Sequence, residues 1–237
     1  MNLLLLQSED FISPTQAWVS GRRCAHIKQV LKAQRGDTLT VGALNGKIGH
    51  AKIHAITNEC IELEILNLNS NPPATLPLTL ILGLPRPRML HRTLQTIATM
   101  GVEKLILIQS ARVEKSFWQT PLLKPEAIHE NLILGLEQGK ATQLPQVELH
   151  QRFRPFMEDE LPKLLESHQH RLIAHPGDYP RAKPLTTAKA LLAIGPEGGF
   201  QAQEVSHFQS CGFQAIQLGE RILRVETAIP VLLAKLY

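Results

Sequence analysis

The sequence has few cysteines, and their spacing excludes two ways of stabilising a fold. Among its 237 residues are three cysteines, Cys24, Cys60 and Cys211, with no CxxC pair. An odd number of widely separated cysteines forms neither a disulfide framework nor a typical zinc site. The ten histidines also lack ligand spacing of the HExxH kind. We therefore expect no metal.

A long apolar run is absent near the start of the chain. The first ten residues, MNLLLLQSED, hold an apolar run of only four leucines, with no basic segment before it and acidic residues after it. Such a segment is neither a secretory signal nor a membrane span. We therefore expect a cytoplasmic protein with no membrane partner.

The charge balance shows only a small excess of one sign. Lys and Arg number 25 against 21 acidic residues, and hydrophobic residues make up 43% of the chain, which indicates a globular protein. A net charge of +4 favours a polyanionic partner such as RNA. Solvated basic side chains are also ordinary at protein surfaces, so the position of the charges matters more than their sum.

The first part of the chain, residues 1–70, reads as a β-rich module. Between residues 37 and 56, β-branched residues alternate or cluster around Asn45 and Gly46, a pair typical of a hairpin turn, and ECIELEIL alternates cleanly. A small barrel is the natural closure of such strands. The polar, proline-rich segment 67–77 then predicts a linker to a second domain.

One helix is expected within this module. Ile27, Val30 and Leu31 recur at helical spacing before the turn at Gly36 and Asp37. Basic residues concentrate on this helix and its approach, as at a phosphate-binding edge. A merely solvated helix face remains the alternative.

The second domain alternates strand and helix patterns. LTLILGL is an apolar run of strand length, a helical stripe through Leu90, Leu94 and Ile97 follows, and VEKLILIQ is a further strand. The alternation continues to the C-terminus. It predicts an α/β domain with a mostly parallel sheet and helices on both faces.

The C-terminal part carries two glycine-marked loops that follow strands. ALLAI (190–194) breaks at GPEGG before a helical segment that ends at Gly212, and FQAIQL (213–218) stops at Gly219. Thr227 is expected to cap the last helix, with Pro230 in its first turn. The carboxyl ends of parallel strands bind ligands, although glycine and proline also serve ordinary turns.

IGPEGGF followed by LGERILRVETA resembles the paired signature of the RsmE family, the 16S ribosomal RNA uridine N3-methyltransferases of the SPOUT superfamily. The resemblance implies an N-terminal PUA-like RNA-binding barrel (1–70) and a SPOUT domain (74–237) with a C-terminal trefoil knot. It also implies a homodimer, a partner in ribosomal RNA or the small ribosomal subunit, and S-adenosylmethionine bound among the loops AHPGD, IGPEGG and LGERIL. The implied cofactor-binding residues are Ala174, His175, Pro176, Ile194, Gly195, Pro196, Glu197, Gly198, Leu218, Gly219, Ile222, Leu223, Arg224, Thr227 and Ala228.

Two residues of these motifs are candidates for the chemistry. Uridine N3 holds its proton at neutral pH, so methylation requires removal of that proton or stabilisation of the developing negative charge. Arg224 is expected to supply a fixed cation. Glu197 is expected to act as a base or to orient one, although its carboxylate would serve equally well to cap a helix or pair with an arginine.

RNA contacts are expected from basic residues of both domains. The arrangement of His26, Val30, Leu31, Gly36 and Asp37 resembles the family's PUA-like barrel, which favours RNA binding by the first helix. The candidate RNA-binding residues are Arg22, Arg23, His26, Lys28, Arg35, Arg86, Arg88 and Arg112.

Two departures from the family pattern leave a rival function open. Thr96 and Thr99 stand where the family usually has Lys and Glu, and Ala141 stands where it has Arg. An RNA-binding or ribosome-assembly factor with an altered or lost methylation target is therefore the alternative. A dinucleotide-binding Rossmann enzyme is disfavoured, because its GxGxxG would follow the first strand.

Overall fold

The computed structural model describes residues 2–186 and 188–237, which form two compact units. The first unit comprises Met1–Ala74 and Leu132–Leu144, and the second comprises Thr75–Asn131 and Pro145–Tyr237. Residues 132–144 group with the first unit although they are distant from it in sequence. The expected domains, 1–70 and 74–237, were each a single continuous segment. No helix of the described part is long and apolar enough to cross a membrane.

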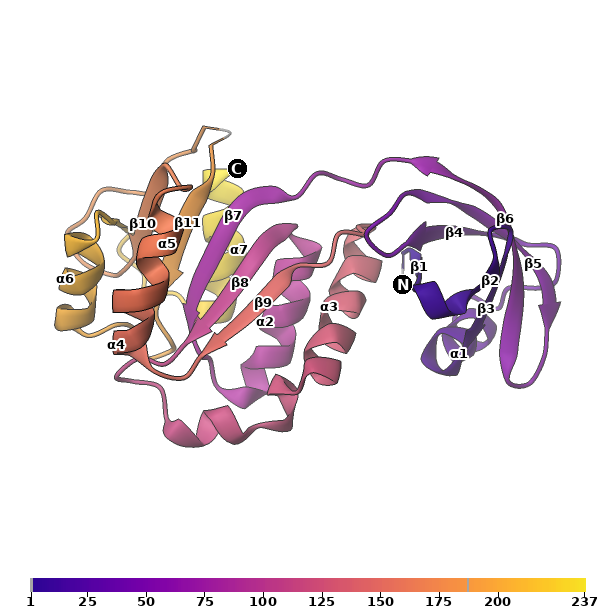
Figure 1. Cartoon of the computed structure of the whole chain (residues 1–237), viewed down its shortest axis with the longest axis horizontal. Helices are drawn as coiled ribbons and strands as arrows, with labels where there is room; N and C mark the ends of the chain where they lie inside the picture. Colours follow the sequence, from indigo (N-terminus) through magenta and orange to yellow (C-terminus); the bar gives the residue numbers. More distant parts are fainter. Residues whose placement is uncertain (1, 187) are drawn as a thin grey trace. The chain divides into compact units, whose positions relative to one another are not determined.

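The first unit contains a six-stranded sheet in the order β1-β4-β5-β6-β3-β2 (Figure 1). The hairpin of β4 and β5 turns at Asn45, whose φ of 57° suits the left-handed conformation that asparagine tolerates. The sheet is open, with β1 and β2 at its edges, so the expected barrel is not confirmed. Its elements are β1 (Leu4–Leu6), a 3-10 turn (Ser8–Asp10), β2 (Phe11–Ser13), β3 (Gln16–Ser20), α1 (Gly21–Gln29), β4 (Thr38–Ala43), β5 (Ile48–Ile56) and β6 (Cys60–Ser70).

Helix α1 is shorter than the sequence pattern suggested. Cys24 and Ile27 are buried against the sheet, but Val30 is 64% exposed. The helix ends at Gln29, and Lys32 has a positive φ of 52° that no right-handed helix accommodates. The helical spacing of apolar residues therefore extends to Leu31, two residues beyond the end of α1 at Gln29.

The second unit contains a parallel six-stranded sheet in the order β12-β10-β11-β7-β8-β9. This confirms the expected α/β class and its parallel sheet. The strands are β7 (Leu76–Gly83), β8 (Val102–Ile108), β9 (Gln146–His150), β10 (His170–Ala174), β11 (Ala190–Ile194) and β12 (Gln214–Ile216). Its helical segments are α2 (Pro87–Thr99), 3-10 turns at Lys115–Gln119 and Pro121–Leu123, α4 (Phe153–Pro155), a π segment (Phe156–Glu160), α5 (Leu161–Leu165), α6 (Ala202–Ser210) and α7 (Val225–Leu236). Helix α3 (Pro125–Gly139) belongs to both units, since its residues from Leu132 onward are grouped with the first.

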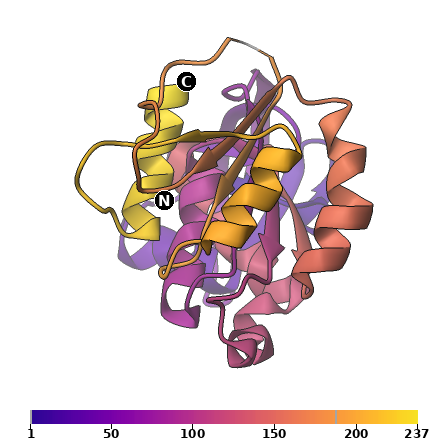
Figure 2. The ribbon, with the colours of Figure 1, turned by 90° about the vertical axis from the view of Figure 1, so that its left-hand side faces the viewer.

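Helices cover both faces of this sheet, with α4, α5 and α6 on one side and α2 and α7 on the other (Figures 1 and 2). Ile81, Ile106 and Leu191 pack with Phe156 and Phe208 in one apolar cluster. Because neighbouring strand residues point to opposite faces, Leu80 and Leu82 turn toward the other layer and are fully buried there. Burial on both faces explains why these strands read as unbroken apolar runs.

The last helix begins earlier than expected. Arg224, not Thr227, occupies the N-cap position of α7, and Pro230 lies inside the helix and not in its first turn. Pro230 has no N–H for the carbonyl one turn before it, so one intrahelical hydrogen bond is missing there. The polar Thr227 was the better capping residue by preference alone, but the chain turns into the helix three residues before it.

His168 connects the end of α5 to the sheet, because the helix ends at Leu165 and β10 begins at His170. The residue is 8% exposed, with Nδ1 2.7 Å from the carbonyl oxygen of Leu164 and Nε2 3.2 Å from Thr79 Oγ1. A neutral ring that donates from Nδ1 to the carbonyl and accepts at Nε2 from the hydroxyl satisfies both contacts. Burial lowers the pKa of His168 below its usual 6.5.

We predict that protonation of His168 destabilises the fold at mildly acidic pH. The unfolded chain takes up this proton near pH 6.5, whereas the folded chain takes it up only at lower pH, so the stabilisation is complete above 6.5 and is lost as pH falls. His168→Gln removes the titration. Its free energy of unfolding, from urea denaturation at several pH values, should fall less steeply with decreasing pH than that of the wild type, and equal slopes would contradict the prediction.

Candidate active site

A pocket of about 450 Å³ opens at the carboxyl ends of three neighbouring strands in the second unit. Ala174, the last residue of β10, pairs in register with Ile194 at the end of β11 and with Ile216 at the end of β12. All three residues line the pocket. The parallel register therefore brings together the three loops that follow these strands, as the sequence suggested for this edge of the sheet.

The GPEGG turn forms one wall of the pocket, and its first glycine is required by the backbone. A Cβ atom at Gly195 would lie 2.5 Å from the backbone nitrogen of Phe200. Gly199 has a φ of 71°, and its N–H donates to the carbonyl of Pro196 at 2.7 Å. The turn is thus too tight for side chains at these positions.

Arg112, from the loop after β8, lies against the same turn. Its Nη1 donates a hydrogen bond to the carbonyl of Gly198, and a Cβ at position 198 would lie 3.0 Å from Arg112 Cδ. Arg112 also lines the pocket. The stem of Arg112 therefore leaves little room for a side chain at position 198.

Glu204 holds both the loop that carries Arg112 and the end of the GPEGG turn. It is buried, Oε1 accepts the N–H of Ala111 at 2.8 Å, and Oε2 accepts the N–H of Gln201 at 2.8 Å. The first contact holds the loop that carries Arg112, and the second closes a capping box at the start of α6. Sequence reasoning missed Glu204, although the three-residue spacing of Gln201 and Glu204 at a helix start was a usable signal.

His175 belongs to the loop after β10 and lines the pocket. Its N–H donates to the carbonyl of Ile216 at 3.0 Å, and its ring contacts Tyr179. Burial, and secondarily the positive charge of Arg112, lower the pKa of His175. Both effects favour the neutral imidazole.

Glu197 lies on the pocket wall with its carboxylate directed to a neighbouring element. Oε1 accepts the backbone N–H of Arg86 at 2.9 Å, where Arg86 is the N-cap residue of α2. A carboxylate at a helix N-terminus interacts favourably with the helix dipole. From the sequence, helix capping was an alternative role for Glu197. The carboxylate makes such a contact, but to the start of α2 and not to the helix that follows the turn.

Most of the residues expected to bind the cofactor line this single pocket. Arg224 and Thr227 do not: Arg224 is exposed, and its carbonyl accepts the N–H groups of Thr227 and Ala228 at the start of α7. The expected residues in the lining are Ala174, His175, Pro176, Ile194, Gly195, Pro196, Glu197, Gly198, Leu218, Gly219, Ile222, Leu223 and Ala228. The lining also includes Arg112, Gly199, Ile216, Gln217, Arg221, Val225 and Leu232, of which the sequence had suggested only Arg112, as an RNA contact.

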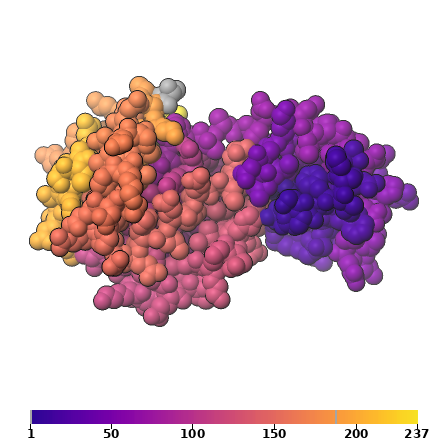
Figure 3. All heavy atoms as spheres, in the orientation of Figure 1, coloured from indigo at the N-terminus to yellow at the C-terminus, as the bar shows by residue number. Residues whose placement is uncertain are grey.

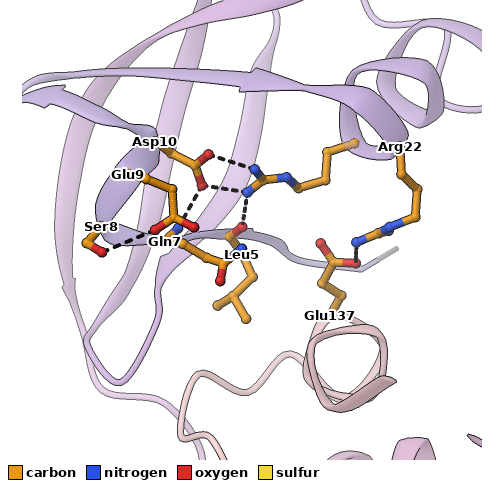
Figure 4. Close-up of polar contacts among 8 residues, drawn as sticks. Leu5, Gln7, Ser8, Glu9, Asp10, Arg22 and Glu137 are labelled. Atoms are coloured by element: carbon orange, nitrogen blue, oxygen red, sulfur yellow. Dashed lines mark hydrogen bonds and ion pairs between the residues drawn. The ribbon is translucent and has the colours of Figure 1, made fainter. Parts of the chain in front are cut away.

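Two of the expected RNA-binding arginines in the first unit are engaged within the fold (Figure 4). Arg23, whose side chain is 15% exposed, donates to both oxygens of Asp10 at 2.6 Å and to the carbonyl of Leu5. Arg22, 40% exposed, forms an ion pair of 2.9 Å with the buried Glu137, and burial raises the pKa of that carboxyl despite the opposing effect of Arg22. Because removal of one partner from a buried pair costs about 3–5 kcal/mol, the contact with Asp10 gives Arg23 a structural role.

The remaining basic candidates are more accessible. Lys28 Nζ donates to the carbonyl of Thr57 at 3.0 Å, and His26 is half-buried with a pKa lowered mainly by burial. Arg35, Arg86 and Arg88 are exposed. Within the described residues, no cluster of three or more His, Cys, Asp or Glu side chains is placed to hold a metal ion.

Residues 72–237 match the family model of the RNA methyltransferase domain. The match covers the second unit, which contains the pocket. The C-terminal part of this unit is the orange and yellow surface in Figure 3. The chain belongs to the family of ribosomal RNA small subunit methyltransferase E, the RsmE family.

Relatives and solved structures agree with this assignment. Ribosomal RNA small subunit methyltransferase E of Treponema pallidum is 32% identical over 236 residues, covering 96% of this chain and 87% of the relative. The crystal structure of the protein of that name from Neisseria gonorrhoeae, bound to S-adenosyl methionine, is 25% identical with a TM-score of 0.74, covering 99% of this chain and 94% of the other. A methyltransferase structure from Legionella pneumophila, 21% identical with a TM-score of 0.77 and covering 98% and 95% of the two chains, has the same fold.

The loop after β12 provides a test of the pocket. Gly219 has a φ of 138°, and among the described residues, its two chain neighbours aside, no atom lies within 4 Å of the position that a Cβ would take, so a side chain there meets backbone strain and not a clash. Gly219→Val should cost about 1–3 kcal/mol of strain, which the loop relieves by leaving its position in the pocket wall. We predict about tenfold or greater loss of S-adenosylmethionine affinity by titration calorimetry.

Gly212→Val is the matched control. Gly212 also has a positive φ, of 84°, but it ends α6 and does not line the pocket. This variant should lose stability by a similar amount and keep wild-type affinity. Equal affinity losses in both variants would show that the effect is general destabilisation.

Proposed function

We propose that the protein transfers the methyl group of S-adenosylmethionine to N3 of a uridine in 16S ribosomal RNA. The observation that carries the proposal is the pocket built by the ends of β10, β11 and β12 within the segment that matches the RNA methyltransferase family. The relative from Neisseria gonorrhoeae, by its description, binds S-adenosyl methionine with the same fold. A ribosomal substrate also implies that the protein works in the cytoplasm.

The pocket lining suits this cofactor. Leu223, Ala228 and Leu232 offer apolar walls, and backbone groups of the three loops offer hydrogen bonds to a purine edge. Gln217 adds a specific feature, because its Oε1 is buried without a hydrogen-bond partner in the described part of the chain. Since buried acceptors are normally satisfied, a bound amino group such as that of adenine is a fitting partner.

The chemistry requires little from the protein beyond orientation and charge. S-adenosylmethionine supplies an electrophilic methyl group on a sulfonium sulfur, and transfer to uridine N3 leaves S-adenosylhomocysteine while the N3 proton passes to water or a base. The glycine turn fixes one wall of the pocket, which limits the orientations open to an acceptor base. His175 remains neutral, so it offers a hydrogen bond without adding charge.

The roles of Arg224 and Glu197 rest on the family resemblance. Arg224 is proposed to stabilise negative charge on the uracil oxygens, and its neighbours Leu223 and Val225 line the pocket although Arg224 does not. Glu197 is proposed to orient the site through its contact with Arg86, in preference to a role as base, because Oε1 already accepts a hydrogen bond. Single-turnover rates of Arg224→Ala and Glu197→Gln test the two roles.

The first unit is proposed to bind the RNA backbone. Arg35 is exposed, and Arg22 and Lys28 are held by contacts to Glu137 and Thr57 that leave part of each side chain accessible. Phosphate contacts position RNA without reading its sequence. Arg35→Gln should therefore weaken RNA binding and reduce its salt dependence.

Three finer structural features are proposed from the resemblance. A PUA-like module in residues 1–70 fits the β-rich first unit. A trefoil knot in residues 74–237 fits the hydrogen bond from the Leu185 N–H to the Leu236 carbonyl, which brings the loop before β11 against the end of α7. A homodimer would cover Ile222, which is 82% exposed on the pocket loop, and light scattering tests it.

The rival function is a ribosome-assembly factor with an altered target. The sequence supported it because Thr96, Thr99 and Ala141 replace residues that the family usually has. None of these three lies in the described lining of the pocket, so the substitutions leave the proposed cofactor site unchanged. The methyltransferase proposal is therefore the better supported of the two.

Nucleoside mass spectrometry of 16S ribosomal RNA tests the reaction directly. Cells that lack the protein should lose one 3-methyluridine, and the wild-type protein should restore it while Gly219→Val should not. Loss of a different methylated nucleoside would contradict the uridine N3 target. An unchanged set of methylated nucleosides would favour the assembly factor.

A further inference from the structure

The loop after β8 presents one arginine to the pocket in a fixed position. Arg112 lines the pocket, its stem packs against Gly198, and its Nη1 donates to the Gly198 carbonyl. An exposed arginine normally samples many rotamers, and here the contact to a backbone carbonyl restricts them. The guanidinium is thus held at one wall of the site.

The backbone that carries Arg112 is held from both sides. The buried Glu204 accepts the N–H of Ala111 at 2.8 Å, directly before the arginine. On the other side the Gln109 side chain donates to the carbonyl of Val113 at 2.8 Å and accepts the indole N–H of Trp118 at 2.5 Å. These hydrogen bonds, two to backbone groups and one between side chains, restrict the loop on both sides of Arg112.

The charge of Arg112 is not neutralised by the protein. Across residues 2–186 and 188–237, no carboxylate oxygen lies within ion-pair distance of its guanidinium. The acid of the same turn, Glu197, instead accepts a hydrogen bond from Arg86. A guanidinium carries five N–H donors and one is used on Gly198, so a fork of donors remains for an anion.

We propose that Arg112 binds an oxyanion of the pocket's occupants and that Glu204 is its positioning residue. The inference rests on the proposed function, which supplies two oxyanions of the same chemistry: the carboxylate of S-adenosylmethionine and a phosphate of the RNA acceptor. Both suit the paired donors of a guanidinium.

Binding measurements on the full chain distinguish the two sources. Calorimetry compares S-adenosylmethionine with its decarboxylated analogue, and a second titration measures the affinity for a 16S ribosomal RNA transcript at several salt concentrations. If Arg112 binds the carboxylate, Arg112→Gln loses about tenfold or more in affinity for S-adenosylmethionine and little for the analogue. If it binds a phosphate, the variant loses RNA affinity and its salt slope decreases by about one unit.

Arg154→Gln is the matched control, because Arg154 is exposed on α4, pairs with Glu158 and does not line the pocket. It should keep wild-type values in both titrations. Arg112→Gln with wild-type values in both titrations would overturn the inference. Failure of the wild type to bind S-adenosylmethionine would instead contradict the proposed function.

A double-mutant cycle tests the role of Glu204. Glu204→Gln retains the size of the side chain but loses one of two backbone contacts, so it should weaken binding in the same titration as Arg112→Gln. If Glu204 acts through Arg112, the double variant is no weaker than Arg112→Gln alone. Additive losses, with melting temperatures showing that both variants fold, would overturn the positioning role.

Discussion

Parallel hydrogen bonding among β10, β11 and β12 is the constraint on which the candidate site depends. In register, Ala174, Ile194 and Ile216 end together, so the loops that follow them emerge at one edge of the sheet. A slip of one strand by one residue would break this alignment and turn its side chains to the opposite faces of the sheet. The pocket is therefore formed by the ends of the sheet strands and the loops that follow them.

The loops are then fixed by contacts between distant parts of the chain. Arg112 reaches the Gly198 carbonyl, Glu204 reaches Ala111 and Glu197 reaches Arg86, so the glycine turn is joined to the loops after β7 and β8. These polar groups lie beside the pocket and satisfy backbone N–H and C=O groups that a loop otherwise leaves to water. The geometry of the turn is therefore a property of three segments together, and a substitution in any one of them changes the others.

The strongly patterned elements could be predicted from the sequence alone. The apolar run ALLAI is β11 from end to end, and Gly212 follows α6 with the positive φ expected after a helix. Such signals are local, because burial on two faces and a left-handed C-terminal residue each leave a mark on a few residues. The family resemblance added the three loops, and most of their predicted residues line one pocket.

Contacts across long separations could not be read in this way. Arg112 and Gly198 are 86 residues apart, and no pattern in either segment indicates that they meet. The same holds for Arg23 and Asp10, whose ion pair no pattern in either segment indicates. Thr227 was a better helix cap by residue preference than Arg224, but the path of the loop after β12 decided where α7 starts.

Hydrogen–deuterium exchange on the full-length protein tests the central claim, that the three loops bind one small molecule. With S-adenosylmethionine present, amides of 174–177, 194–200 and 216–225 should exchange more slowly together, because the occupant orders all three loops. Adenosine triphosphate, which shares the adenosine but not the methionine part, is the specificity control. No protection, or protection confined to other segments, would contradict the account.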